Sequence, residues 1–204
     1  MEKVTIGEAL EFIGVDPKDF NLRREHFSRA DYAINRKHGM QHLYRVMILC
    51  AQIARMINMP REGLLAFCGA FIHDLARMDN GRGEHHGTNA ANEKFPLFEN
   101  LWQKYELTEQ ERNWVRAAVA EHDGERGHGY EGCYVVKKIL TDADALDRVR
   151  FYHHGRLNPD RLHFPESHEL IAVDEDYCAH TREIEEVMNF MDFINLCEGR
   201  RSDL

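Results

Sequence analysis

The 204-residue sequence predicts an all-α protein, and three observations support this prediction. Apolar residues recur at helical spacing in several segments, and no segment shows the alternation that is typical of a half-buried strand. Only five prolines occur, which leaves long segments free to be helical. Thr5 precedes Glu8, and Thr108 precedes Glu111, in the spacing of a helix-capping box. Together these features favour helices packed around one core.

Segments with helical periodicity follow one another along the chain, separated by short breaks. Helices are expected at about residues 4–13, 41–58, 60–77, from 88 onward, 108–122, 133–147 and 167–197. Pro60 ends the second of these segments. Residues 18–37 are polar and basic, and are expected to form another helix or an irregular arm. Turn-forming residues predict loops at 79–87, 123–132 and 152–166.

The most apolar stretch, residues 63–76, ends in the pair His73-Asp74. On a helical wheel its large apolar residues share one side. The small residues Ala66, Gly69 and Ala70 share the other, where neighbouring helices can approach closely. His73 falls on the small-residue side. A buried carboxylate or imidazole is costly unless it is paired or bound to a metal, so this pair is a candidate metal platform.

Composition and charge restrict the class of protein. Apolar residues make up 43% and charged residues 30%, as in an ordinary globular domain. The net charge of −9 argues against general binding to nucleic acid or anionic membranes, although a few arginines can still hold a small anionic substrate. The five cysteines are widely spaced, and no signal sequence or membrane span is recognised. We therefore expect a reduced, cytoplasmic protein.

Two further histidines lie at the edges of apolar helical stripes, His42 in one segment and His122 in another. Either alone is usually an ordinary boundary residue, but with His73-Asp74 they bring imidazoles from three helices. Nitrogen and carboxylate donors suit Zn, Mn, Fe, Co or Ni. Asp142 and Asp144 are about 200° apart on a helix, so only one can point at such a site, and periodicity does not choose between them.

The ordered set of motifs resembles the HD-domain metal-dependent phosphohydrolases. The motifs span about residues 38–150 and read Gly39-x-x-His42-x-x-Arg45-Val46, His73-Asp74-Leu-Ala-Arg77, His86-Gly87 and Asp142-Ala-Asp144-Ala-Leu-Asp147. The resemblance implies an antiparallel helical bundle forming one domain over residues 1–204, with helices of 167–197 packed on the core. It also implies hydrolysis of phosphate esters of nucleotides or related small molecules.

The resemblance further implies that one divalent metal is held by four ligands, His42, His73, Asp74 and Asp144. Asp144 is favoured over Asp142 because the family's last ligand is the aspartate of an Ala-Asp-x-Leu setting. The metal is expected to be Mn, Mg, Fe, Ni, Co or Zn. Asp74 is expected to orient or partly deprotonate a metal-bound water.

His86 and His122 leave an open alternative. They could assist proton transfer beside one metal, or hold a second metal with Asp74 as the bridge. The second arrangement resembles the dinuclear iron oxygenases of the same fold. A non-catalytic nucleotide-binding regulatory domain is a third hypothesis.

Phosphate recognition requires cations near the metal. Arg45, Arg77 and Arg148 are candidates because each stands three or four residues beyond an expected ligand, and Lys137 and Lys138 lie one to two turns before Asp144. Each could equally pair with surface carboxylates. The expected partner is a small phosphorylated anion. No nucleic acid polymer or membrane is expected, and self-association of the chain is left open.

Overall fold

The computed structural model describes residues 4–35, 37–80, 85–122, 124, 129–151 and 157–200. Within these ranges the chain forms helices and helical turns and no strand, which confirms the all-α prediction. The α-helices are α1 (Ile6–Phe12), α2 (Met40–Met56), α3 (Pro60–Ile72), α4 (His86–Asn89), α5 (Glu99–Lys104), α6 (Glu109–Glu121), α7 (Tyr134–Leu146), α8 (Ile171–Thr181) and α9 (Phe190–Cys197). None of these helices is both long and apolar enough to cross a membrane.

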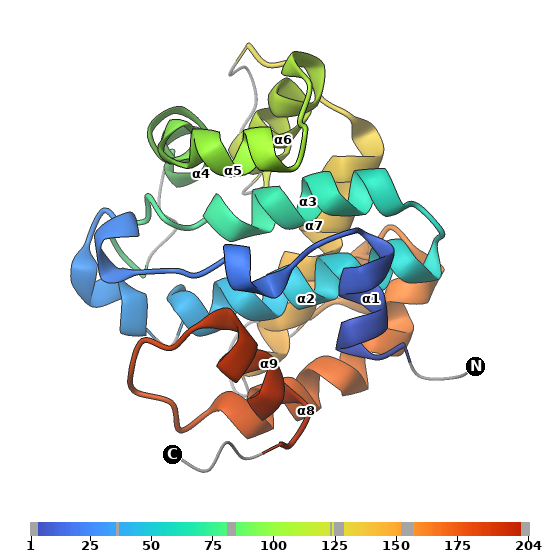
Figure 1. Cartoon of the computed structure of the whole chain (residues 1–204). Coiled ribbons are helices and arrows are strands. Elements are labelled where there is room, and N and C mark those ends of the chain that lie inside the picture. The colour runs from blue at the N-terminus through green and yellow to red at the C-terminus, as the bar shows by residue number, and fades with distance from the viewer. Residues whose placement is uncertain are drawn as a thin grey trace.

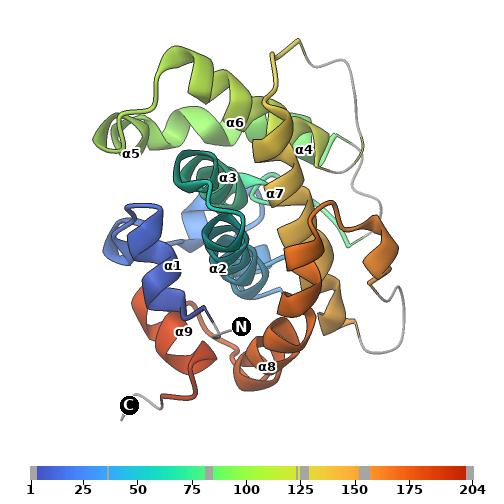
Figure 2. The same cartoon turned by 90° about the vertical axis from the view of Figure 1, so that its right-hand side faces the viewer.

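Helices α2 and α3 form the centre of the molecule and run side by side (Figure 1). Figure 2 looks along both of them and shows α7 on one side, α1 on the other, α5 and α6 above, and α8 and α9 below. This position explains why every residue of α2 from Met40 to Ala54 is buried. Side chains between Met40 and Ala54 of α2 and between Gly63 and Ile72 of α3 are therefore removed from water, whether they are apolar or ionisable.

Two glycines allow the central helices to pack closely. A Cβ atom added at Gly63 would lie 2.2 Å from the Cβ of Ala54, so α3 and α2 touch there with no room for a side chain. A Cβ at Gly69 would lie 3.3 Å from Leu140 of α7. The small-residue side of the apolar stretch thus faces α7 and α6, where the helical wheel predicted that neighbouring helices can approach closely, and His73 follows Gly69 by one turn.

Both predicted capping boxes are present. The Thr108 hydroxyl accepts a hydrogen bond from the Glu111 amide at 3.3 Å, and the Glu111 carboxylate accepts one from the Thr108 amide at 2.8 Å. Thr5 and Glu8 make the same reciprocal pair at the start of α1. Satisfying the first amides of each helix fixes where it begins.

Helix α3 ends at Ile72, whereas the sequence predicted helix to about Arg77. The His73 ring Nδ1–H donates to the Ala70 carbonyl at 2.8 Å. In a continuing α-helix that carbonyl would accept from the Asp74 amide. The side chain of His73 therefore ends the helix, and Asp74 lies in the turn that follows.

The C-terminal region is two helices and not the one long helical region predicted over 167–197. Residues 182–189 separate α8 from α9. Side chains of α2 bind this segment: Gln41 donates to the Ile184 carbonyl at 2.5 Å, and the Tyr44 hydroxyl donates to the Met188 carbonyl at 3.4 Å. The Asn189 side chain then caps α9 by accepting from the Asp192 amide at 2.9 Å.

The sequence left open whether residues 18–37 form a helix or an irregular arm. Residues 18–37 include an irregular arm with short 3₁₀ turns at Arg24–His26 and Ala30–Ile34. The Leu22 amide attaches this arm to α2 by donating to the Tyr44 hydroxyl at 2.8 Å. The helix expected from residue 88 begins slightly earlier, at His86. Parts of the three predicted loops lie outside the described residues: 81–84 of the loop 79–87, 123 and 125–128 of the loop 123–132, and 152–156 of the loop 152–166.

Candidate metal centre

Five helices bring six ionisable side chains to one buried position beside α2 and α3. We call these residues the polar cluster, which consists of His42, His73, Asp74, His86, His122 and Asp144. The side chains of the first five are at most 4% exposed, whereas the side chain of Asp144 is 31% exposed. The cluster therefore reaches solvent at Asp144, in the last turn of α7.

Three of these residues, His42, His73 and Asp144, lie on the side of Asp74 that its Oδ2 faces, which we call the first side. His42 Nε2 lies 3.1 Å from His73 Nε2, 3.3 Å from Asp144 Oδ1 and 3.5 Å from Asp74 Oδ2. His73 Nε2 lies 3.9 Å from the same oxygen of Asp144. These are the four residues that the resemblance implied as metal ligands, and the fold brings all of them together.

The protonation of the two imidazoles decides whether this group fits a metal. The Nδ1–H of His73 donates to a backbone carbonyl, and that of His42 donates to an Asp147 oxygen at 2.5 Å. Burial lowers the pKa of His73 to about 3, so that ring is neutral. The Nε2 lone pair of His73 thus faces His42 Nε2 among two carboxylates, an arrangement that a cation relieves.

The spacing agrees with this interpretation. Metal–nitrogen and metal–oxygen bonds of about 2.1 Å place neighbouring ligand atoms about 3.0–3.4 Å apart in octahedral or tetrahedral geometry. The distances from His42 Nε2 to His73 and Asp144 fall in that range, whereas those from His42 Nε2 to Asp74 and from His73 Nε2 to Asp144 are longer, at 3.5 and 3.9 Å. The donor set of two imidazoles and two carboxylates therefore fits a divalent metal ion.

The second side of Asp74 has a different composition. Its Oδ1 lies 3.1 Å from His86 Nε2 and 3.6 Å from His122 Nε2, and those two nitrogens are 3.1 Å apart. Arg77 Nη1 also lies here, 2.8 Å from His86 Nε2 and 3.4 Å from Asp74 Oδ1. Asp74 thus turns one oxygen to each side, as a bridging carboxylate would, but a guanidinium is already present on the second side.

The charges of the cluster follow from these contacts. Burial alone would raise the pKa of Asp74, but the surrounding imidazoles hold it well below its usual value. The pKa of Asp144 is depressed in the same way, against its burial, by His42, His73 and His122. Burial would lower the pKa of His122, yet the Asp74 carboxylate outweighs it and raises the pKa to about 9. His122 is therefore protonated at neutral pH when no metal is bound.

Gly87 is what allows His86 to reach the second side. A Cβ atom at this position would lie 2.6 Å from the Val119 carbonyl and 3.0 Å from His122 Nδ1. That carbonyl accepts the Nδ1–H of His122 at 2.6 Å. Helix α4 can therefore approach the end of α6 only with glycine here.

The structure distinguishes the roles of Asp142 and Asp144, between which helical periodicity does not choose. The Asp142 carboxylate accepts from the amides of His163 and Phe164 at 2.9 and 3.1 Å, and from the Ser167 hydroxyl at 2.8 Å. It holds the chain that leads into α8. Asp144 points to the polar cluster, so the choice made from the Ala-Asp-x-Leu setting agrees with the geometry.

Sequence reasoning assigned no role to two residues that bind the cluster. His38 Nδ1 lies 2.8 Å from Asp74 Oδ2, and Asp147 bonds the far nitrogen of His42. A signal was present for each: His38 precedes His42 by four residues, and Asp147 follows Asp144 by three. Such spacings place side chains on one face of a helix.

Of the five predicted phosphate-binding cations, Arg77 is the one whose described contacts include the polar cluster. Arg45 is buried and donates to Asp147 and to the Thr181 hydroxyl, so its guanidinium is directed elsewhere and we assign it no phosphate-binding role. Lys137 pairs with Glu121, the residue before His122. Lys138 lies 4.1 Å from the ring centre of Tyr134, and Arg148 is exposed.

Fold and site define an all-α protein whose buried histidine and aspartate side chains can hold a divalent metal. The family model described as HD domain matches residues 39–160, which is more than half of the chain and includes the whole polar cluster. The chain therefore belongs to the HD-domain family, whose superfamily consists mostly of metal-dependent phosphohydrolases. No curated protein and no solved structure matches the chain significantly.

Proposed function

We propose that the protein is a metal-dependent phosphohydrolase that acts on a phosphate ester of a nucleotide or a related small metabolite. The observation that carries the proposal is that His42, His73 and Asp144 lie together, with Asp74 Oδ2 3.5 Å from His42 Nε2 and Arg77 beside Asp74. Such a site combines metal ligands with a guanidinium that can neutralise phosphate. Membership of the HD-domain family supports the same class of reaction.

Each residue has a distinct task in this proposal. Bound among the four ligands, a divalent metal would lower the pKa of a bound water and polarise the phosphoryl group. Asp74 Oδ1, which lies on the second side, can orient the attacking water. His122 Nε2 holds a proton 3.6 Å from Asp74 Oδ1 and can deliver it to the departing oxygen.

Arg77 supplies the positive charge that phosphoryl transfer requires. Its guanidinium already lies against His86 and Asp74, so its position is fixed before a substrate binds. A planar guanidinium can bind two phosphate oxygens at once. The substrate would reach this group past Asp144, the partly exposed member of the cluster.

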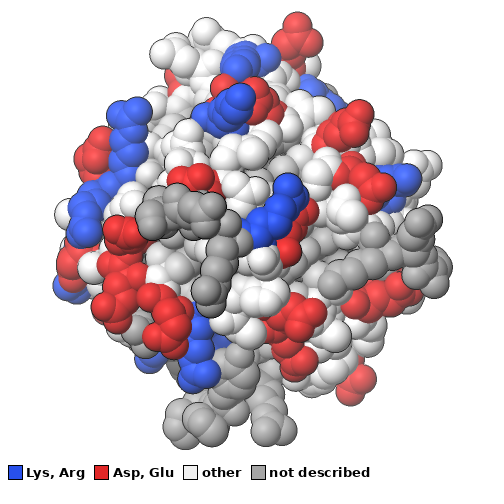
Figure 3. Space-filling view, turned by 60° about the horizontal axis from the view of Figure 1, so that its bottom comes forward, with Lys and Arg blue, Asp and Glu red and all other residues white. Residues whose placement is uncertain are grey.

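The charge of the surface agrees with a small substrate. In the face shown in Figure 3, lysine and arginine side chains are dispersed among aspartate and glutamate. Together with the net charge of −9, this distribution favours a small phosphorylated anion over a nucleic acid polymer. We keep the cytoplasm as the proposed location.

The second side of Asp74 favours one other candidate, a dinuclear iron oxygenase. His86, His122 and Asp74 Oδ1 lie as close together as the ligands of a second metal would. Metal analysis separates the two functions: two irons per chain with oxygen consumption would support the oxygenase, and one Mn, Mg, Ni or Co would support the phosphohydrolase.

The proposal is tested by removing metal from the purified protein and adding back each divalent metal separately. Phosphate release is then measured with nucleoside mono- and triphosphates, cyclic nucleotides and phosphorylated metabolites. We expect activity with metal only, and its loss in His73→Ala. His180→Ala is the control, because it removes an exposed imidazole outside the cluster. Hydrolysis at the full rate without metal would contradict the proposal, and tight nucleotide binding without hydrolysis would indicate a regulatory domain.

A further inference from the structure

A second group of buried charges lies behind His42, on the side away from the polar cluster. Its centre is Asp147, which is fully buried and accepts the Nδ1–H of His42 at 2.5 Å. Arg45 and Arg150 both contact the Asp147 carboxylate. Three ionised side chains thus stand directly behind one expected metal ligand.

The partner of His42 differs from those of the other imidazoles. The Nδ1–H groups of His73 and His122 donate to the backbone carbonyls of Ala70 and Val119. His42 alone among these three donates to a carboxylate. A carboxylate partner fixes which ring nitrogen carries the proton and makes the other nitrogen a stronger metal ligand.

The Asp147 carboxylate is itself held in a fixed orientation. Arg45 donates from Nε to one oxygen and from Nη2 to the other, the latter at 3.3 Å, while its Nη1 donates to Thr181 of α8 at 2.9 Å. Arg150 Nη1 lies 3.0 Å from Asp147 Oδ2. Burial would raise the pKa of Asp147, but the two guanidinium groups and His42 hold it below its usual value.

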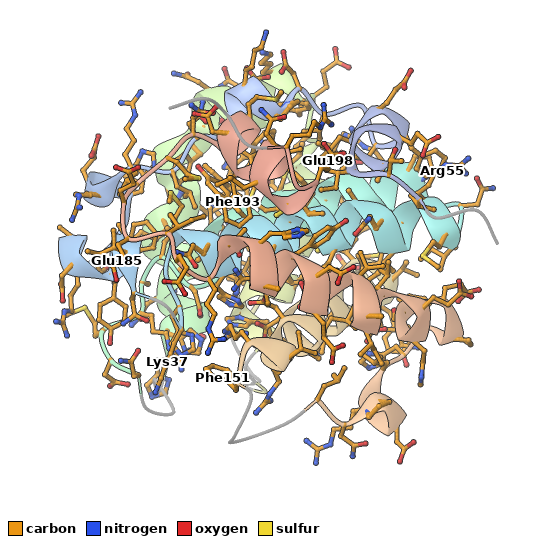
Figure 4. The ribbon with its side chains drawn as sticks, turned by 90° about the horizontal axis from the view of Figure 1, so that it is seen from below. Lys37, Arg55, Phe151, Glu185, Phe193 and Glu198 are labelled. Carbon is orange, nitrogen blue, oxygen red and sulfur yellow. The ribbon has the colours of Figure 1, made fainter. Side chains whose placement is uncertain are left out.

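Arg150 also ties this group to the chain just before α2. Its Nε donates to the Lys37 carbonyl at 3.0 Å. Figure 4 labels Lys37 and Phe151, the residue after Arg150, at the same edge of the molecule. The turn that carries Asp147, helix α8 and the start of α2 are thus joined around the carboxylate.

We propose that Asp147 is a positioning residue of the metal centre, which holds His42 in its Nδ1–H form with Nε2 directed at the metal, and that Arg45 in turn fixes Asp147. The inference rests on the metal site of the proposed function and not on the hydrolysis. It gives Arg45 a role that differs from the phosphate binding expected from its spacing.

The same group does not suit a metal of its own. Donor atoms of Asp147, Asp174 and Cys178 lie within 4.8 Å of one another, but Arg45 and Arg150 already supply the positive charge there. Burial and the charge of Asp147 raise the pKa of Asp174 well above its usual value, which favours the uncharged carboxyl. Within the described part of the chain, its Oδ1 has no hydrogen-bond partner.

Asp174 therefore provides a matched control. Asp147→Asn and Asp174→Asn replace a carboxyl with an amide in one buried group, but of the two side chains Asp147 is the one held ionised and bonded to His42. Titration of the metal-free proteins with Mn²⁺ alone, followed by calorimetry, should show a loss of affinity of about 10–100-fold for Asp147→Asn. Asp174→Asn should bind as the unchanged protein does. Unchanged affinity in Asp147→Asn, or equal losses in both variants, would overturn the proposal.

Two further measurements keep the test decisive if Asp147→Asn does not fold. Nitrogen-15 NMR of the metal-free natural protein should show His42 protonated at Nδ1, and an unprotonated Nδ1 would overturn the proposal without any variant. Arg45→Lys keeps the positive charge but loses the fork that binds both oxygens, so Mn²⁺ affinity should fall less than in Asp147→Asn. Neither readout depends on substrate, so failure of the hydrolase assignment would be seen separately.

Discussion

The two sides of Asp74 use the same kinds of residue but differ in charge. On the first side, Asp74 Oδ2 faces the imidazoles of His38 and His42, and His42 in turn contacts His73 and Asp144; no lysine or arginine is among the described contacts there. On the second side, Oδ1 faces two imidazoles and the Arg77 guanidinium. The first side requires a cation and the second already has one. Under the proposed function, this difference places the metal on the first side and the handling of protons and phosphate on the second.

The largest effect is expected from Asp144→Asn, which removes a charged ligand from the first side. Mutation of a residue that hydrogen-bonds a metal ligand typically lowers metal affinity or activity by about 10–100-fold. Loss of a ligand itself should therefore lower metal affinity and phosphate release by more than about 100-fold. Metal content and initial rates at saturating metal would measure both quantities.

Asp142→Asn provides the comparison on the same helix. Its carboxylate is hydrogen-bonded to four groups ahead of α8, so we expect a loss of about 1–3 kcal/mol in the free energy of unfolding, with metal content retained. Denaturant unfolding and metal analysis of Asp142→Asn and Asp144→Asn check these expectations. Equal metal content in the two variants would remove the distinction between the aspartates.

On the second side, His122→Gln should slow hydrolysis and leave the first metal in place. Proton transfer by a positioned side chain contributes about 10²–10⁴-fold, so the rate constant should fall by at least about 100-fold. Metal content should stay as in the unchanged protein. A variant that loses its metal along with its activity would show that His122 belongs to the primary metal site.

Arg77→Met should act mainly on substrate binding. Losing a charge-assisted hydrogen bond to phosphate costs about 1.5–3 kcal/mol, so kcat/KM should fall by about 10–150-fold. Arg77→Lys, which keeps the charge, should recover part of this loss. Steady-state kinetics with one phosphate ester provides the measurement, and unchanged kcat/KM in both variants would exclude Arg77 from phosphate recognition.

A smaller effect concerns the attachment of α6, which carries His122, to α3, which carries His73. Arg61 of α3 binds both oxygens of Glu111 and, with the Thr108 cap, lowers the pKa of Glu111 from 4.5 to about 2. A depressed carboxyl pKa contributes stability above the unfolded value, and this is lost as pH falls toward 2. Glu111→Gln should therefore cost about 1 kcal/mol at neutral pH.

The pH dependence checks the sign of that effect. The difference in unfolding free energy between Glu111→Gln and the unchanged protein should be constant above about pH 5 and shrink between pH 4.5 and 2. Denaturant unfolding at several pH values measures it. A difference that grows at low pH would contradict the assigned ion pair.

Much of the fold and of the first side could be predicted from sequence, because the responsible signals are local. Capping boxes at Thr5 and Thr108 mark helix starts, and the small residues around Gly69 show where α7 approaches. The order of His42, His73-Asp74 and Asp144 identified the four converging side chains. Each of these signals depends on spacing along a single helix or on a short motif.

The rest depends on contacts between distant segments, which spacing does not encode. Nothing local indicates that the His73 ring ends α3 by taking a backbone carbonyl, or that Arg45 is turned to Asp147 and not to the cluster. Likewise, the break between α8 and α9 is held by α2 side chains about 140 residues away. Side-chain partners that are far apart in sequence decided these points.

The most direct test of the account is a titration of the metal-free protein with Mn²⁺, with bound metal and phosphate release measured on the same samples. The account predicts no hydrolysis without metal, and a rate that rises in proportion to bound metal until the first side is filled at one ion per chain. Hydrolysis at the full rate with no bound metal would contradict it.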